Sequence, residues 1–442
     1  MPNRDDLKAA VCRAIDARKV DIIDVAKSIL HMPEPGFREF KTSEYVDRKL
    51  TQLGIPHRTG IALTGIKAAV SGGSSGPSVC IFGELDSLVV PDHPYADKTS
   101  GAAHACGHNV QIAMMYACAA AITQSGVLPS LAGRVVFIAV PAEEGIEIEY
   151  RYGLVKQGKL HYLTGKPEFI KLGELDDVDI AIMTHTSPDL EGKKLATCDT
   201  NNGVIRKAAR FIGRSAHAGL APHKGINALN AAMLAMNAIN AQRETFQDTD
   251  TVRVHPIITK GGDAVNAVPA EVSLESYVRA KAASAMLDAN AKVDRSLRAG
   301  AMAVGARVRI STIPGSMPLV AYPELWKIYT PNAVGAVGAE ALGSKGHSTG
   351  STDMGDVTQI MPAIHPYSGG VTGTPHGCDY IIDDYETALI APAKAMAMTV
   401  VDLLADGAIK AKEVIAKSRP PMTKQQYLNA LDSLFKEEDY QG

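Results

Sequence analysis

Several features that would assign this 442-residue sequence to a class at once are scarce or missing. Basic and acidic residues nearly balance, 45 Lys and Arg against 48 Asp and Glu, so no excess of positive charge favours a nucleic acid or an anionic membrane as partner. The six cysteines are scattered along a long chain, several of them inside apolar runs. This distribution is typical of reduced, buried thiols and lacks the density of a disulfide framework.

Long apolar runs are also missing. No stretch approaches the roughly 20 uninterrupted apolar residues of a membrane span. The opening MPNRDDLKAAVCRAIDARK lacks the apolar core of a signal peptide. We therefore expect a soluble, cytoplasmic protein with neither a membrane nor a nucleic-acid partner. The length of the chain favours two domains over one.

Polar side chains follow three short apolar runs that are predicted to be strands. SVCIFG is followed by Glu84 and Asp86, RVVFIAVP by Glu143 and Glu144, and VDIAIMT by His185. Continuous apolar runs with helices between them are typical of buried parallel strands. Ligand sites in such α/β sheets form beyond the carboxyl ends of the strands, so we expect these side chains to share one edge.

The pattern changes near residue 200, where a smaller domain is predicted. Strand-like and helix-like segments alternate as β-α-β-β-α-β, the order of a ferredoxin-like α+β domain. We place this inserted domain at 201–316 and a discontinuous larger domain at 1–200 and 317–442. The larger domain is predicted to be α/β, with a mixed, mostly parallel sheet flanked by helices. Near the N-terminus, helical periodicity covers about 6–30, and KTSEYVDRKLTQLGI predicts a helix capped by Thr42 or Ser43 and ended by Gly54.

The stretch HACGH places Cys106 and His108 two residues apart. In an extended segment such residues share a face, which Gly107 permits, and Asn109 can then cap the following helix. A thiolate and an imidazole together suit a borderline-soft divalent metal such as zinc. The pattern alone equally allows a loop cysteine beside solvent-exposed histidines.

Glu143 and Glu144 are adjacent carboxylates at the end of a buried strand. Their mutual repulsion is costly there without a cation. One can bind metal while the other acts as general base, although a solvated acidic turn is the alternative reading. His185 and His376 say little alone, but with Cys106 they complete a ligand set for a dinuclear site.

The inserted domain has its own polar cluster, with His217 and His223 in GRSAHAGLAPHKG, Asn266 in GGDAVNAVPAE and Arg279 in SYVRA. An amide and a guanidinium could bind substrate oxygens, and Arg279 suits a carboxylate. Ordinary polarity at strand edges explains each residue taken singly.

Taken in order, these motifs resemble the aminoacylase and glutamate-carboxypeptidase metallohydrolases of metallopeptidase clan MH. The nearest branch contains p-aminobenzoyl-glutamate hydrolases and auxin-conjugate amidohydrolases. Its motifs HACGHD, PAEE, GGHAAxPH and NxxP stand here as HACGHN, PAEE, RSAHAGLAPH and NAVP. THTSPD and TPHG carry the remaining histidines, and the likeness extends from about His31 to ALIAPAKAMAMTVVDLL.

The resemblance implies a zinc-aminopeptidase-like catalytic domain and a role for each residue of its site. Two divalent cations, which could be Zn, Mn, Co or Ni, would be bound by Cys106, His108, Glu144, His185 and His376, with Cys106 as a bridge. Glu143 would be the general base, and Asp86 would support the metal ligands.

The resemblance also implies that the inserted domain dimerises. His217 would reach the active site of the partner subunit in a homodimer and polarise the scissile carbonyl. Asn266 and Arg279 would bind substrate, with Arg279 holding a free carboxylate. The predicted reaction is hydrolysis of the amide bond of an N-acyl amino acid, a dipeptide or an aminobenzoyl-glutamate-like conjugate. A non-catalytic amino-acid or peptide binder on the same scaffold is the alternative.

Three departures from the branch stand out. Asn109 replaces the usual aspartate after CGH, and Glu84 stands where aspartate is usual. The segment between Glu144 and His185 is long for the branch, and we expect EYRYGLVKQGKLHYLTGKPEF, residues 149–169, to form a loop over the site.

Overall fold

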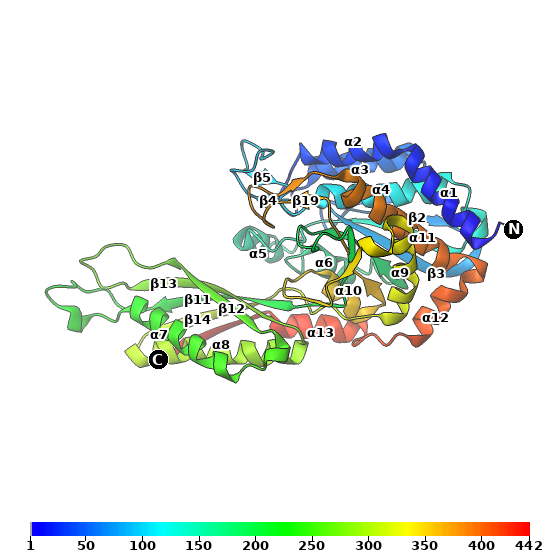
Figure 1. Cartoon of the computed structure of the whole chain (residues 1–442). Coiled ribbons are helices and arrows are strands. Elements are labelled where there is room, and N and C mark those ends of the chain that lie inside the picture. Colours follow the sequence, from blue (N-terminus) through cyan, green and yellow to red (C-terminus); the bar gives the residue numbers. More distant parts are fainter. Residues whose placement is uncertain (1) are drawn as a thin grey trace. The chain divides into compact units, whose positions relative to one another are not determined.

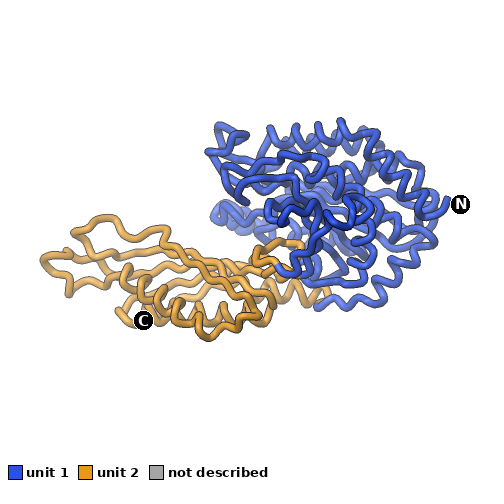
Figure 2. Tube along the Cα trace, in the orientation of Figure 1, with its two compact units in different colours: residues 1–199, 320–347, 356–421 blue, residues 200–319, 348–355, 422–442 orange. Residues whose placement is uncertain are grey.

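The computed structural model describes residues 2–442, which divide into two compact units (Figure 2). Unit 1 contains residues 2–199, 320–347 and 356–421, and unit 2 contains residues 200–319, 348–355 and 422–442. The C-terminal segment thus differs from the prediction that placed it in the larger domain. The reason is that strand β21 (Lys436–Gln441) pairs antiparallel with β14 (Arg307–Pro314) at the edge of the unit 2 sheet.

The main sheet of unit 1 is mixed and mostly parallel, as predicted. Strand β3 runs parallel to both β6 and β7, and β7 runs parallel to β17, while β2 and β1 continue the sheet antiparallel beyond β6. The order is β1 (His57–Ile61), β2 (Gly65–Ser71), β6 (Ala132–Val140), β3 (Ser74–Glu84), β7 (Ile180–Ile182), β17 (Ala363–Ile364).

Helices pack around this sheet in unit 1 (Figure 1). The buried helix α4 (His108–Gln124) packs on β3 and also contacts α1 (Arg4–Ala17), α2 (Lys19–Leu30) and α11 (Ala391–Leu404). The helix predicted over 6–30 is in fact two, because the chain leaves helical geometry at Arg18. The segment Glu386–Leu404 is long and apolar enough to cross a membrane, but 94% of its most apolar window is buried inside the protein, as in a core helix.

Helix α3 (Phe40–Gln52) begins before the predicted caps. Thr42 and Ser43 lie inside the helix, and the carboxylate of Glu34 accepts hydrogen bonds from the backbone N–H groups of Lys41 and Thr42. A distant side chain therefore does the work that a local N-cap residue usually does.

Unit 1 also contains shorter helices and strands outside its main sheet. Its remaining helices are α5 (Ile148–Lys156), α6 (Gly165–Leu172), α9 (Pro323–Val337), α10 (Met354–Ile360), which starts in unit 2, and α12 (Ile409–Lys417). Its remaining strands are β4 (Leu88–Val89), β5 (Ala102–Ala103), β8 (His185–Thr186), β9 (Leu195–Thr197), β15 (Leu342–Ser344), β17, β18 (Tyr367–Ser368), β19 (Val371–Thr372) and β20 (Ile381–Ile382).

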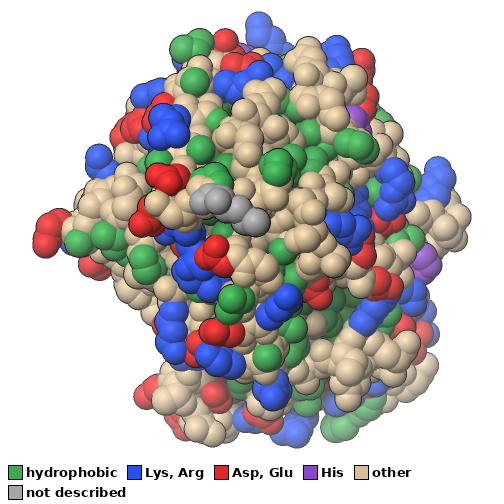
Figure 3. All heavy atoms as spheres, turned by 90° about the vertical axis from the view of Figure 1, so that its right-hand side faces the viewer, with side chains coloured by type: hydrophobic (Ala, Val, Ile, Leu, Met, Phe, Trp, Pro, Cys, Tyr) green, Lys and Arg blue, Asp and Glu red, His purple; other side chains and the backbone are tan. Residues whose placement is uncertain are grey.

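Unit 2 has the predicted ferredoxin-like order. Along the chain it runs β11 (Gly203–Ile212), α7 (Ala228–Ala241), β12 (Arg253–Lys260), β13 (Glu271–Ala280), α8 (Ala283–Val304), β14. The sheet order is β12-β13-β11-β14-β21, with α7 and α8 packed together against it. The C-terminal segment adds α13 (Lys424–Leu434) and the edge strand β21. Figure 3 shows one face of the whole chain, on which Lys and Arg side chains are interspersed with Asp and Glu.

Candidate metal centre

The polar residues that follow the predicted strands do meet at one edge of the unit 1 sheet. Strands β6, β3 and β7 are neighbours in parallel register. Glu84 ends β3, the pair Glu143-Glu144 follows β6, and His185 follows β7. Carboxyl ends of parallel strands share one edge, so residues far apart in the sequence become neighbours there.

The HACGH stretch forms a tight turn rather than the extended segment that we expected. Gly107 has φ 81°, and a Cβ atom at this position would lie 2.2 Å from Oγ1 of Thr186. His108 is the first residue of α4, and the turn still directs Cys106 and His108 to one place. Asn109 is not a cap, because its fully buried side chain donates a hydrogen bond to the carbonyl of Ala26 at 3.1 Å.

Two overlapping groups of donor atoms lie at this edge. Cys106, His108 and His185 form one group, and Cys106, Glu144 and His376 form the other, with all donor atoms of a group within 4.8 Å of one another. Sγ of Cys106 lies 3.3 Å from Nε2 of His185 and 3.7 Å from Nε2 of His376. Nε2 of His376 lies 3.4 Å from Oε1 of Glu144. Cys106 is thus common to both groups.

These separations fit ligands of a shared cation. Two atoms bound to one ion at about 2.0–2.3 Å, with about 90–115° between them, lie roughly 2.8–3.9 Å apart. Oε1 of Glu144 and Nε2 of His108 are buried and make no hydrogen bond within residues 2–442. Burial and the nearby Glu144 raise the pKa of the Cys106 thiol, a cost that a divalent cation offsets by binding the thiolate. The donor set therefore fits two divalent cations, which these five residues would hold, with Cys106 common to both donor groups.

Asp86 orients two members of this set, in line with its predicted supporting role. Nδ1 of His108 lies 3.1 Å from Oδ1 of Asp86, which leaves Nε2 facing the site, and the backbone N–H of Glu144 donates to Oδ2 at 2.9 Å. Burial opposes ionisation of Asp86, but the hydrogen bond and charge of His108 lower its pKa. An ionised, fully buried carboxylate thus fixes the ring that it contacts.

Glu84 and Lys166 form a buried ion pair that sequence reasoning did not find. Both side chains are fully buried, and Nζ of Lys166 donates to Oε1 of Glu84 at 2.5 Å. The other oxygen, Oε2, lies 3.1 Å from Nε2 of His108. Burial raises the pKa of Glu84, but the charges of Lys166 and His108 lower it to about 2. The sequence signal for this ion pair was Lys166, a lysine among the buried residues of α6. Its partner Glu84 lies 82 residues away in the sequence, so the pair could not be predicted from local patterns.

The segment 149–169 is not the loop that we expected, because it forms α5 and the start of α6. It sends Arg151, which is fully buried, to donate to the carbonyl of Leu163 at 2.8 Å. It also places the N–H of Gly165 3.2 Å from the carbonyl of Ala142. This segment therefore helps to build the support of the site.

Ala142 is a strained residue directly before the Glu143-Glu144 pair, with φ 54°. Its N–H donates to Oε1 of Glu39 at 2.8 Å, and Oε2 of the same carboxylate accepts from Thr64 at 2.7 Å. Burial and the charge of Asp86 raise the pKa of Glu39 to about 7. Glu39 was also missed, since it lies more than 100 positions from the residue that it holds.

Glu143 itself is half-buried, and its carboxylate lies within 4.8 Å of donor atoms of Glu84 and His108. His104, the first histidine of HACGH, is outside the candidate metal-binding groups, and burial lowers its pKa to about 3. The predicted general base thus lies beside the metal ligands, while the first histidine of the motif points elsewhere.

The predicted residues of unit 2 do not form one cluster. His217 and Asn266 are exposed and lie on neighbouring loops, joined by a hydrogen bond from the N–H of Ala218 to the carbonyl of Asn266 at 2.9 Å. Arg279 lies near the other end of β13 and donates to Ser351 at 2.7 Å. At about 3.3 Å per residue, the eight steps from Glu271 to Arg279 span roughly 26 Å.

Comparison with known proteins gives concordant results. Residues 200–302 match a family described as peptidase dimerisation domain. The chain is 30% identical over 322 residues to human Xaa-Arg dipeptidase, covering 70% of this chain and 68% of that protein. It is 27% identical over 266 residues to N-acetyl-L-cysteine deacetylase of Bacillus subtilis, covering 58% and 59%. A dinuclear metal-binding peptidase of the M20 family from Bacillus subtilis shares the fold, with TM-score 0.67 at 21% identity over 88% of this chain and 99% of that one.

Proposed function

The chain belongs to the M20 family of metal-dependent peptidases and amidohydrolases, and we propose that it cleaves the amide bond of an N-acyl amino acid or a dipeptide with a free carboxylate. The predicted family, fold class and hydrolase activity are confirmed by these relatives. One relative is named for a dipeptide and another for an N-acetyl amino acid. Both compounds present an amide bond next to a free carboxylate.

The observation that carries the proposal is the pair of donor groups that share Cys106. Four donors arranged around one thiolate would supply two cation sites next to the carboxylate of Glu143. When bound, two divalent cations polarise the amide carbonyl and make a water molecule more acidic. Mixed sulfur, nitrogen and oxygen donors accept zinc, manganese, cobalt or nickel, so the experiment below compares these four metals.

The residues of this chain divide the remaining work. Glu143 removes a proton from the attacking water and delivers it to the nitrogen of the departing amine. Asp86 keeps Nε2 of His108 turned towards the site, and Glu39 holds the Ala142 turn from which Glu143 extends. A preorganised arrangement of this kind avoids reorientation during the reaction.

The geometry of unit 2 supports a homodimer in which two copies build each site. In this proposal Arg279 binds the substrate carboxylate, and His217 polarises the scissile carbonyl. Arg279 lies near one end of β13, and the loop of His217 lies beside the loop that leads into the other end, roughly 26 Å away. This distance is too long for both residues to contact one small substrate. In a dimer, Arg279 of one copy and His217 of the other can serve the same site. Exposed apolar side chains near His217, Leu220 and Val265, are consistent with a buried partner there.

A substrate panel tests the proposal. The purified protein is stripped with a chelator and reloaded separately with Zn, Mn, Co or Ni, and bound metal is counted per chain. Release of free amine is then measured with N-acetyl amino acids, dipeptides and an aminobenzoyl-glutamate conjugate. We expect two metal ions per chain and turnover that requires them. A protein that binds two ions and releases no amine from any member would contradict the proposed reaction.

A further inference from the structure

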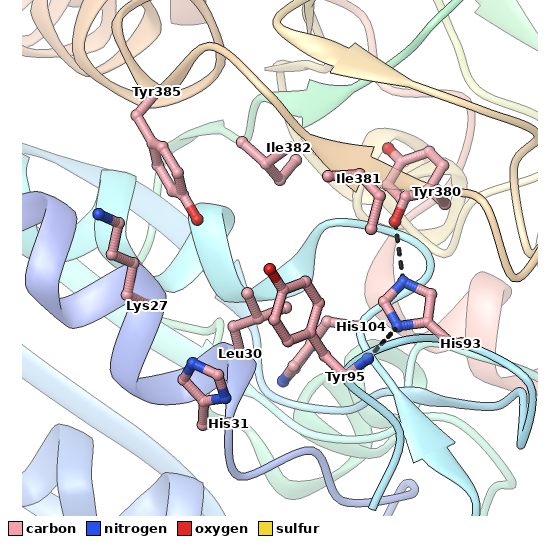
Figure 4. Close-up of a pocket in the computed structure, with 10 residues that line it drawn as sticks. All are labelled: Lys27, Leu30, His31, His93, Tyr95, His104, Tyr380, Ile381, Ile382 and Tyr385. Carbon is pink, nitrogen blue, oxygen red and sulfur yellow. Dashed lines mark hydrogen bonds between the residues drawn. The ribbon is translucent and has the colours of Figure 1, made fainter.

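Unit 1 contains a cavity of about 190 Å³ that is separate from the two metal-binding groups. Its walls come from the end of α2, the loop after β4, His104, and the segment 380–385 (Figure 4). An engineered protein cavity of about 150 Å³ accepts benzene, so this space suits a ligand built on one ring or a short branched chain.

The cavity collects polar groups that the fold leaves unused. His104 lines it and is 3% exposed, and neither ring nitrogen has a partner with normal hydrogen-bond geometry in residues 2–442, although the carbonyl of Ile29 lies near. The hydroxyls of Tyr95 and Tyr385 point into the same space (Figure 4). Buried polar groups normally find partners, so the buried ring of His104 indicates a ligand, which the two more exposed tyrosine hydroxyls can also contact.

The neighbouring His93 shows the contrast. Its Nε2 donates to the carbonyl of Tyr380 at 2.9 Å, and its Nδ1 accepts from the N–H of Tyr95 at 3.2 Å (Figure 4). Both nitrogens are used, so this ring is a structural part of the wall. His104, two residues before Cys106, has no comparable assignment.

The charge of the lining selects the ligand. Lys27 lies at the rim, with Nζ 5.5 Å from the centre of the Tyr385 ring, and none of the described residues that line the cavity is an Asp or Glu. Asp384, next in sequence to Tyr385, already accepts hydrogen bonds from Glu386 and Thr387. Leu30, Ile381 and Ile382 supply apolar surface. A carboxylate matches the donors and Lys27, whereas an ammonium group finds no anion here.

We propose that this cavity is a second binding site, for a small carboxylate with a compact apolar body and no free amine. Two kinds of compound share this chemistry. One is an N-acylated amino acid, whose amine is blocked, and the other is the carboxylic acid that amide hydrolysis releases. The bound compound contacts His104 and therefore touches the turn that carries Cys106 and His108.

Calorimetric titration with benzoate tests the site. Benzoate should bind the metal-loaded protein, and Lys27→Met should weaken binding about tenfold, with Tyr385→Phe weakening it less. Lys281→Met is the matched control, since it removes the same charge from an exposed side chain in unit 2 and should leave the affinity unchanged. Equal affinity of the wild type and Lys27→Met, or benzylamine binding as tightly as benzoate, would overturn the proposal.

Two further arms locate the ligand and identify its source. Carboxylates also bind metal ions, so the titration is repeated after chelation, and the affinity for benzoate should stay within twofold. Loss of binding on chelation would place benzoate at the metal centre and reject the cavity. In the chelated protein, where no substrate turns over, N-acetylglycine is compared with benzoate and with glycine. Tighter binding of N-acetylglycine than of glycine supports the site and points to an N-acylated amino acid as the ligand. Tighter binding of benzoate than of glycine supports the site and points to the released carboxylic acid. Tighter binding of glycine than of either compound contradicts the proposal.

Discussion

In unit 1 most of the side chains assigned to the site are buried and lie together, whereas in unit 2 His217 and Asn266 are exposed and lie at the opposite end of a sheet from Arg279. Glu84, Asp86 and His108 are each at most 1% exposed, and each of the two carboxylates lies 3.1 Å from a ring nitrogen of His108. Glu143 is half-buried and His376 is exposed. His217 and Asn266 are exposed and rest mainly on their own loops. The difference agrees with the proposal that unit 1 assembles the metal ligands by itself, while the residues of unit 2 complete the site of a second copy.

The largest expected effect is on Glu143, whose loss should stop the chemistry without disturbing the assembled ligands. In Glu143→Ala we expect kcat to fall by about 10⁴-fold, at the upper end for general acid–base catalysis, with bound metal unchanged. Glu149→Ala, an exposed carboxylate on α5, is the control and should retain full activity. Metal analysis and amine release are measured on the same preparations. Normal turnover in Glu143→Ala would remove this residue from the role of base.

The second prediction breaks the buried network of unit 1. Lys166→Met leaves Glu84 buried and charged without its lysine partner, and removing one partner of a buried pair costs about 3–5 kcal/mol of unfolding free energy. Lys19→Met removes a lysine from the solvent-exposed pair with Glu386 and should change the unfolding free energy far less than Lys166→Met does. Urea unfolding measures both variants.

A compensating change sharpens this test. The double variant Glu84→Gln, Lys166→Met removes both charges and should be more stable than Lys166→Met alone. If Lys166→Met lost no more stability than Lys19→Met, the buried pair would not be a structural support of the site.

The comparison also explains which parts of the site could be read from the sequence. Cys106, His108, Glu144, His185 and His376 are metal-binding residue types placed after strands or in short motifs, and the structure brings them together. The ferredoxin-like unit was equally readable, because its strands and helices alternate in a fixed order.

The supporting residues could not be read in this way. Glu39 and Ala142, like Glu84 and Lys166, are pairs that only the folded chain makes neighbours. The turn at Gly107 was missed because a residue spacing of two fits an extended segment and a turn equally well. Arg151 was missed because the segment that carries it lacks the periodicity of an exposed amphipathic helix, and we read it as a loop.

The third prediction tests whether unit 2 completes the site of a second copy. His217 is exposed, so His217→Ala should unfold like the wild type, while kcat falls by about 10²–10³-fold, as for a lost oxyanion contact. Mixing His217→Ala with Glu143→Ala after dissociation and reassociation then forms mixed dimers. Each mixed dimer has one intact site if His217 acts on the partner, so activity should recover towards about a quarter of the wild-type value. No recovery, with subunit exchange verified by a mass label, would show that His217 acts within its own chain.

The smallest expected effect concerns Glu39, the carboxylate that holds the Ala142 turn in unit 1. Burial and the charge of Asp86 raise its pKa from 4.5 to about 7, so the folded protein keeps a proton that the unfolded chain releases above its ordinary pKa. Stability should therefore fall as pH rises from about 4.5 to 7 and level off above that, with a slope of at most about 1.4 kcal/mol per pH unit from this group. In Glu39→Gln this part of the slope should disappear.

Urea unfolding of the chelated protein between pH 5 and 8 measures that slope. Glu44→Gln, which changes an exposed carboxylate on α3, is the matched control and should keep the wild-type slope. Glu39 and Asp86 are buried together. The part of the pH dependence of stability that disappears in Glu39→Gln therefore measures how strongly the charge of Asp86 opposes ionisation of Glu39. A wild-type slope in Glu39→Gln would mean that another group in the buried network holds the proton, and that Glu39 supports the turn as an ionised acceptor.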